Sequence, residues 1–192
     1  MTKRLAIFAS GSGSNAESIC NYFKNTSDIE VGLICTNKPD AFIVKRAEKL
    51  NIPIFFITKT ELNNFEALHE KLQSEGINML ILAGFLLKLP VIMVENYPNR
   101  IINIHPSLLP KYGGKGMYGS NIHKAVIENK ETESGISIHF VNQNYDEGKI
   151  ILQKKCALSI DETVETLIKK IQKLEHNYFP SAIEKLLNNY KN

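Results

Sequence analysis

An amide and an imidazole stand two residues apart in the run Asn-Ile-His-Pro-Ser-Leu-Leu-Pro at residues 103–110. Side chains at positions i and i+2 of an extended chain point the same way, so Asn103 and His105 can face one reacting atom. Asn103 can donate an amide hydrogen to a developing oxyanion, and His105 can exchange a proton near neutral pH. Because Pro106 disfavours helix at the preceding residue, the imidazole is expected at the end of a strand.

A carboxylate would complete a proton-transfer site, and the best candidate is Asp146 in the loop Asn-Tyr-Asp-Glu-Gly at 144–148. A nearby negative charge favours imidazolium, so this aspartate is expected to raise the pKa of His105. Asp-Glu-Gly is also an ordinary turn sequence, and the loop alone leaves a structural role for Asp146 open. Three other histidines are predicted to be structural: His69, His123 and His139.

A glycine-rich turn, Ser-Gly-Ser-Gly-Ser-Asn-Ala at 10–16, lies between the first predicted strand and the first predicted helix. Backbone N–H groups at such a helix N-terminus bind anions. The spacing of Gly11, Gly13 and Ala16 also fits the dinucleotide fingerprint, which leaves a nicotinamide-dependent dehydrogenase as an alternative. The acidic residue expected about twenty positions later is missing, because the second strand ends Cys-Thr-Asn at 35–37. A monophosphate site is therefore favoured over a dinucleotide site, and a turn that serves only tight packing remains the other interpretation.

Length and composition indicate one cytoplasmic domain. The chain has 192 residues and 43% hydrophobic content, which suits a single well-buried domain spanning residues 1–192. Three cysteines without metal-ligand spacing argue against a disulfide scaffold and against a metal site. The apolar run at 5–9 is too short for a signal peptide or a membrane span. A net charge of +3 is too mild to indicate a nucleic-acid partner.

Apolar, strand-like runs alternate with helical stretches, which predicts an α/β fold: a Rossmann-like three-layer domain with a mostly parallel sheet. Strands are predicted at 4–9, 30–36, 54–57, 79–83 and 101–104, and helices at 15–24, 41–50, 61–75 and 120–128. Residues 135–141 alternate in polarity and 149–157 follow a short turn, which predicts an antiparallel pair at the C-terminal edge of the sheet. A long final helix is predicted at 161–190, and Pro180 could kink it.

Four segments together resemble the phosphoribosylglycinamide formyltransferases, a branch of the folate-dependent formyltransferase family. They are Gly-Ser-Gly-Ser-Asn at 11–15, Ala-Gly-Phe at 83–85, the run at 103–112 and Asp-Glu-Gly-Lys-Ile-Ile at 146–151. The similarity extends nearly from end to end. The Asn-x-His-Pro run marks the wider formyltransferase group, whereas the glycine-serine turn points to this branch.

The resemblance implies a reaction of purine synthesis in which 10-formyltetrahydrofolate, as co-substrate, formylates the amino group of glycinamide ribonucleotide. Neither a metal nor a covalent enzyme intermediate is implied. Asn103 and His105 would polarise the formyl oxygen and stabilise the tetrahedral oxyanion, while Asp146 would hold His105 protonated. The implied partners are small molecules, with no nucleic acid and no membrane, and the protein is expected to be a monomer or a homodimer.

The same resemblance assigns the binding residues. The ribonucleotide phosphate site is matched by Gly13, Ser14 and Asn15, and a residue that contacts the ribonucleotide is matched by Glu175. The segment bordering the folate's pterin ring is matched by Leu86, Leu87, Lys88 and Leu89, and Asn103 is a further folate contact. The N-terminal half would thus bind the phosphate, and the C-terminal half would bind folate and carry out catalysis.

The chain departs from the family pattern in two places. An arginine that some members use for the folate tail is absent before Phe65, where Asn63 and Asn64 stand. The loop at 113–119 contains four glycines, which is typical of a mobile flap but also of a plain surface loop.

The closest alternatives in the enzyme class are methionyl-tRNA formyltransferase and formyltetrahydrofolate hydrolase, which share the His-Pro motif. The length of the chain favours neither, because both are expected to carry a further domain. A nucleotide-binding regulatory protein that kept the fold without the activity is the alternative from another class.

Overall fold

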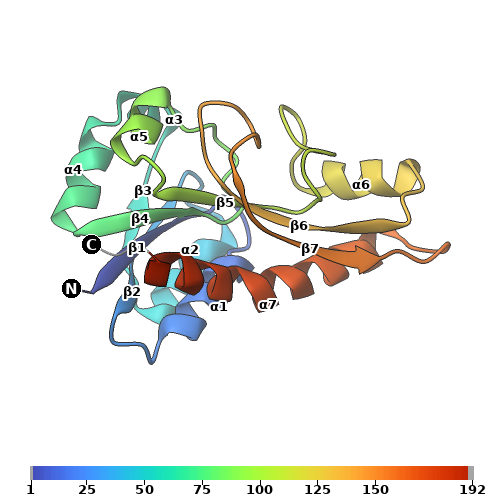
Figure 1. Cartoon of the computed structure of the whole chain (residues 1–192). Coiled ribbons are helices and arrows are strands. Elements are labelled where there is room, and N and C mark those ends of the chain that lie inside the picture. Colours follow the sequence, from blue (N-terminus) through green and yellow to red (C-terminus); the bar gives the residue numbers. More distant parts are fainter. Residues whose placement is uncertain (1, 190–192) are drawn as a thin grey trace.

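The computed structural model describes residues 2–189, and within them seven strands form one sheet in the order β3-β2-β1-β4-β5-β6-β7 (Figure 1). The strands are β1 (Lys3–Phe8), β2 (Ile29–Thr36), β3 (Ile54–Phe56), β4 (Ile77–Leu82), β5 (Ile101–His105), β6 (Glu133–Phe140) and β7 (Ile150–Ala157). Strands β1 to β5 pair in parallel, whereas β5 with β6 and β6 with β7 pair antiparallel. The predicted mostly parallel sheet with an antiparallel C-terminal pair is confirmed.

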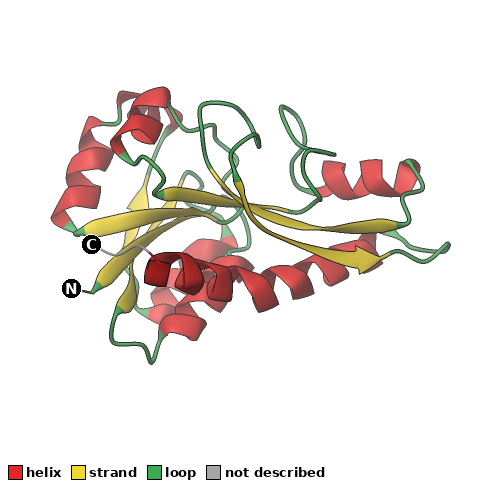
Figure 2. Cartoon of the chain, viewed as in Figure 1, coloured by secondary structure: helices red, strands yellow, loops and turns green. Residues whose placement is uncertain are grey.

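Helices cover both faces of the sheet and give three layers (Figure 2). They are α1 (Ser14–Phe23), α2 (Phe42–Leu50), α3 (Lys59–Asn64), α4 (Glu66–Ser74), α5 (Val91–Asn96), α6 (Ser120–Glu128) and α7 (Val164–Asn189). Because side chains alternate along a strand, Leu5 and Ile7 of β1 pack in the core beneath α1, α2, α6 and α7. Ala6 and Phe8 pack in the opposite core beneath α3, α4 and α5.

Two helical predictions needed correction. The helix predicted at 61–75 is divided into α3 and α4 at Phe65, whose φ of 60° lies in the left-handed region and interrupts the helical path. A capping box between Thr58 and Glu61 starts α3 earlier than predicted. The short helix α5, which follows Pro90, was not predicted.

The long C-terminal helix is confirmed, and it continues through Pro180. Its predicted last residue, Tyr190, lies outside the described residues. No helix within residues 2–189 is both long enough and apolar enough to cross a membrane.

The turn between β1 and α1 depends on Gly13. This glycine has a φ of +74° and directly precedes α1, where no described side chain caps the helix. A Cβ at this position would stand 2.3 Å from Cδ1 of Ile43 in α2. The backbone of the first turn is therefore held against α2 with its N–H groups free of side-chain caps.

We expect Gly13→Ala to lower the free energy of unfolding by about 2–4 kcal/mol, because it combines a left-handed alanine with overpacking against Ile43. Gly11→Ala is the matched control, since a Cβ there meets nothing within 4 Å. Chemical denaturation of both variants checks the prediction. Equal stability of the two variants would show that the turn tolerates a side chain at residue 13.

Candidate functional site

A cavity of about 720 Å³ opens at the C-terminal ends of β1, β4 and β5. The chain leaves β1 toward β2 on one side and β4 toward β5 on the other, so the cavity lies at the topological switch point of the sheet. The loop between β6 and β7 and the glycine-rich loop at 113–119 complete its walls. Each residue proposed from the sequence lines this one cavity: Gly13, Ser14, Asn15, Leu86, Leu87, Lys88, Leu89, Asn103, His105, Asp146 and Glu175.

The antiparallel register of β5 and β6 places His139 directly opposite Asn103. His139 is 2% exposed, and its Nδ1 lies 2.9 Å from the carbonyl oxygen of Phe140. Because that carbonyl can only accept, Nδ1 carries a hydrogen, and Nε2 lies 3.1 Å from Nδ2 of Asn103. The hydrogen on Nδ2 of Asn103 that points away from His139 stays available to a ligand.

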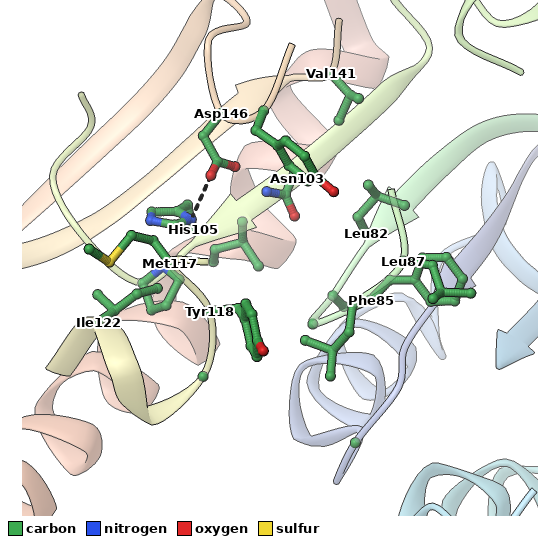
Figure 3. A pocket seen from close by; sticks show the side chains of 18 of the residues that line it. Leu82, Phe85, Leu87, Asn103, His105, Met117, Tyr118, Ile122, Val141 and Asp146 are labelled. Atoms are coloured by element: carbon green, nitrogen blue, oxygen red, sulfur yellow. Dashed lines mark ion pairs between the residues drawn. The ribbon is translucent and has the colours of Figure 1, made fainter. Parts of the chain in front are cut away.

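His105, at the end of β5, is 4% exposed and is held from both sides of its ring. Its Nε2 donates to the carbonyl oxygen of Tyr112 at 2.8 Å, and its Nδ1 lies 3.6 Å from Oδ2 of Asp146 (Figure 3). Burial lowers the pKa of His105 below its usual value, although the charge of Asp146 and the bond to Tyr112 act in the opposite direction. The expected net rise in this pKa was wrong, because desolvation outweighs the carboxylate.

Asp146 connects both histidines to the glycine-rich loop. Its Oδ1 lies 3.6 Å from Nε2 of His139, and its Oδ2 accepts the backbone N–H of Gly114 at 2.9 Å. Burial alone would raise the pKa of Asp146, but the combined influence of His139, His105 and the N–H of Gly114 holds that pKa below its usual value. The residue has a φ of 55°, a conformation that aspartate tolerates better than most residues. A stable carboxylate therefore lies beside the Asn103 and His105 side chains.

The opposite end of the cavity is formed by the start of α1 and by α7. Nδ2 of Asn15 donates to Oε2 of Glu175 at 2.9 Å, and Oδ1 of Asn15 is buried without a partner among the described residues. Burial raises the pKa of Glu175 to about 7, and the bond from Asn15 opposes this shift only in part. The backbone N–H groups of the first turn of α1 and these two side chains form a polar, anion-compatible end.

The segment after β4 forms the apolar side of the cavity. The backbone N–H of Leu86 donates to Oγ of Ser10 at 2.9 Å, and the N–H of Ser10 donates to the carbonyl of Gly84 at 3.0 Å. These bonds fix the loops after β1 and β4 to each other. Leu82, Phe85 and Leu87 lie across the cavity from His105 in Figure 3, so this side of the cavity is apolar.

The sequence interpretation missed His139, which was predicted to be structural and instead contacts both Asn103 and Asp146. The available signal was its place in an alternating strand that pairs with the strand bearing Asn103. His123 is buried in α6 and His69 packs in α4 against Phe65, and neither lines the cavity.

Comparisons with known proteins agree with one another. Residues 3–183 match the family model described as formyl transferase. A phosphoribosylglycinamide formyltransferase of Bacillus subtilis is 36% identical over 190 residues, covering 96% of this chain and 95% of that protein. The chloroplastic phosphoribosylglycinamide formyltransferase of Arabidopsis thaliana is 37% identical over 187 residues, and the match spans 94% of this chain but 64% of that protein. The crystal structure of phosphoribosylglycinamide formyltransferase from Bacillus halodurans superposes with a TM-score of 0.89 at 35% identity, covering 99% of this chain and 98% of that one.

The buried carboxyl of Glu175 predicts a pH-dependent stability. Its pKa is 4.5 when unperturbed and about 7 in the folded protein, so the folded state binds the extra proton between these values. The free energy of unfolding should fall as pH rises from 4.5 through 7, by on the order of 3 kcal/mol at 1.36 kcal/mol per pKa unit.

Glu175→Gln removes this titration and keeps an oxygen that can accept from Asn15. We expect the variant to match the unmodified protein near pH 4.5 and to be more stable at pH 8, as measured by urea denaturation at both pH values. A stability difference independent of pH would contradict a protonated Glu175 in the folded state.

Proposed function

We propose, on the premise that this chain belongs to the formyl transferase family, that it transfers the formyl group of 10-formyltetrahydrofolate to the amino group of 5'-phosphoribosylglycinamide. The products are phosphoribosyl-N-formylglycinamide and tetrahydrofolate, a step of de novo purine biosynthesis. The relatives that carry this name match nearly the whole chain. Both substrates are small molecules, and the reaction needs no metal.

One observation carries the proposal: the anion-compatible start of α1 and the Asn103, His105 and Asp146 cluster line the same cavity. A ribonucleotide with its phosphate at the helix N-terminus can extend its amine toward Asn103. The cavity volume of about 720 Å³ lies within the range usual for small-molecule sites.

The ribonucleotide would be held by the N-terminal part of the chain. Its phosphate would accept backbone N–H bonds from Gly13, Ser14 and Asn15, where the dipole of α1 favours negative charge. Glu175 would contact the ribonucleotide from α7, since it lines the same end of the cavity. A protonated Glu175 can donate a hydrogen bond to the ribonucleotide as well as accept the one from Asn15.

The formyl folate would occupy the side of the cavity formed after β4. Its pterin ring would lie along the backbone of Leu86, Leu87, Lys88 and Leu89, with Val141 and Leu82 as apolar neighbours. Asn103 would reach both the pterin side and the formyl oxygen. The C-terminal part of the chain thus supplies catalysis and most of the folate site.

In the reaction the amine nitrogen attacks the formyl carbon, and a tetrahedral oxyanion forms. The free amide hydrogen of Asn103 and a protonated His105 stabilise that oxyanion. The bond from the formyl carbon to the folate nitrogen then breaks, the amine loses a proton and the folate nitrogen gains one. Because burial lowers the pKa of His105, its imidazolium is a stronger proton donor than usual. The negative charge of Asp146 opposes this shift and so favours the imidazolium form.

His139 would act as a positioning residue. Its Nε2 lies against Nδ2 of Asn103 and would orient this amide toward the formyl oxygen, and it also borders the carboxylate of Asp146. A cytoplasmic location and a monomeric or homodimeric state belong to the same proposal.

The proposal is tested by incubating the protein with 10-formyltetrahydrofolate and glycinamide ribonucleotide and following the release of tetrahydrofolate. We expect release that is saturable in both substrates and dependent on the ribonucleotide. A well-folded protein that releases no tetrahydrofolate, or one that does so equally without the ribonucleotide, would refute the transferase assignment. The second result would indicate a hydrolase.

We expect His105→Ala and Asp146→Asn each to lower kcat by about 10²–10⁴-fold, because both residues act on the transition state. Ribonucleotide affinity should stay near that of the unmodified protein, since the phosphate end of the cavity is untouched. Steady-state kinetics and calorimetric titration with the ribonucleotide measure the two effects. His69→Ala, which removes a histidine outside the cavity, is the control and should retain turnover. An equal loss of kcat in His69→Ala, or unchanged turnover in either site variant, would contradict the assigned roles.

A further inference from the structure

Helix α2 holds two successive carbonyl oxygens of the glycine-rich turn between β1 and α1. The backbone N–H of Ile43 donates to the carbonyl of Gly11 at 3.2 Å, and Nε of Arg46 donates to the carbonyl of Ser12 at 2.9 Å. Gly11 and Ser12 line the cavity, whereas Ile43 and Arg46 are not among the described residues that line it. Both carbonyls are therefore bound from behind the cavity wall.

These two bonds determine the direction of the N–H groups that follow. Both peptide units are trans, and in a planar trans unit the C=O and the N–H point in opposite directions. Because the carbonyls of Gly11 and Ser12 point toward α2, the N–H groups of Ser12 and Gly13 point away from it. Successive N–H groups that point the same way form a concavity that binds anions.

We propose that Arg46 is a positioning residue for the ribonucleotide phosphate: it holds the Ser12 carbonyl behind the wall and so aims the N–H of Gly13 at the phosphate. The inference rests on the proposed function, because it assumes that a phosphate binds at the start of α1. It goes beyond that function, because Arg46 acts through the backbone of the turn and does not touch the substrate.

Three contacts fix the guanidinium in this orientation. Besides the bond to Ser12, Nη1 of Arg46 forms an ion pair with the carboxylate of Glu17, in the first turn of α1. The guanidinium carbon lies 5.0 Å from the centroid of the Phe42 ring. A planar guanidinium can donate from its edge and pack with its face at the same time, which a lysine ammonium cannot do. The direction of the Ser12–Gly13 peptide is therefore set before a ligand binds, which lowers the entropy cost of binding.

The ion pair has a second consequence for an anion. Glu17 carries a negative charge into the first turn of α1, where it would repel a bound phosphate. Arg46 neutralises this charge. Orientation of the peptide and neutralisation of Glu17 are different effects, and replacing both side chains separates them.

The test compares two neutral replacements of Arg46 in a Glu17→Gln background, where no unpaired carboxylate remains. Arg46→Gln keeps an N–H donor on Cδ, where Nε of arginine stands, whereas Arg46→Met has none. In calorimetric titration, we expect glycinamide ribonucleotide to bind about 10-fold more weakly to Arg46→Met than to Arg46→Gln, because an aligned hydrogen bond to a charged group is lost. Glycinamide riboside, which lacks the phosphate, should bind equally to both.

Steady-state kinetics supply a second measurement. The KM for the ribonucleotide should be higher in Arg46→Met by the same factor, whereas kcat and the KM for the formyl folate should be alike in both variants. Lys45→Met is the matched control, because Lys45 is an exposed cation whose Nζ lies 6.0 Å from the centroid of the same Phe42 ring. It should leave both affinities unchanged.

Equal ribonucleotide affinity of the Arg46→Met and Arg46→Gln variants would overturn the inference, and so would an equal loss for the riboside. The two proposals fail separately because binding is measured without turnover. A protein that shows the Arg46-dependent phosphate preference but transfers no formyl group refutes only the proposed reaction. One that transfers formyl groups with the same ribonucleotide KM in both variants refutes only the role of Arg46.

Discussion

The arrangement of the cavity depends on one partly buried carboxylate, that of Asp146. Asp146 remains ionised because two histidines and a backbone N–H surround it, and each of these partners comes from a different part of the chain: His105 from β5, His139 from β6 and Gly114 from the glycine-rich loop. Removing a charge from water costs several kcal/mol unless such partners are present. The same contacts that lower this cost also bring the proposed catalytic groups together.

The pairing of the strands brings together the groups that surround the Asp146 carboxylate. Parallel pairing of β1, β4 and β5 brings their C-terminal ends to one edge, so the anion-compatible turn, the segment after β4 and the His105 imidazole meet there. The antiparallel addition of β6 then places His139 opposite Asn103. A change of register by one residue would turn His139 to the other face of the sheet and separate it from Asn103. The chemistry of the site therefore relies on the junction between the parallel and antiparallel parts.

Sequence patterns predicted most of the strands and the residues that line the cavity, because buried parallel strands are continuous apolar runs and the motifs at their ends are specific. They failed where the outcome depends on tertiary structure. The left-handed Phe65 that divides α3 from α4 has no glycine to signal it, and α5 is too short for a clear periodicity. The contact between His139 and Asn103 requires the register of β5 and β6. The direction of the pKa shift of His105 depends on how deeply the ring is buried, which local sequence does not reveal.

The glycine-rich loop and the charge of the site are physically linked through Asp146. The N–H of Gly114 donates to Oδ2 from a backbone with a φ of +92°, a conformation with little cost for glycine. A hydrogen bond to an ionised carboxylate is stronger than one to a neutral acid, so the loop is held most firmly when Asp146 is charged. Met117 and Tyr118 of the same loop line the cavity beside His105. The charge that we propose to support proton transfer at His105 thus also holds the loop that lies beside this imidazole.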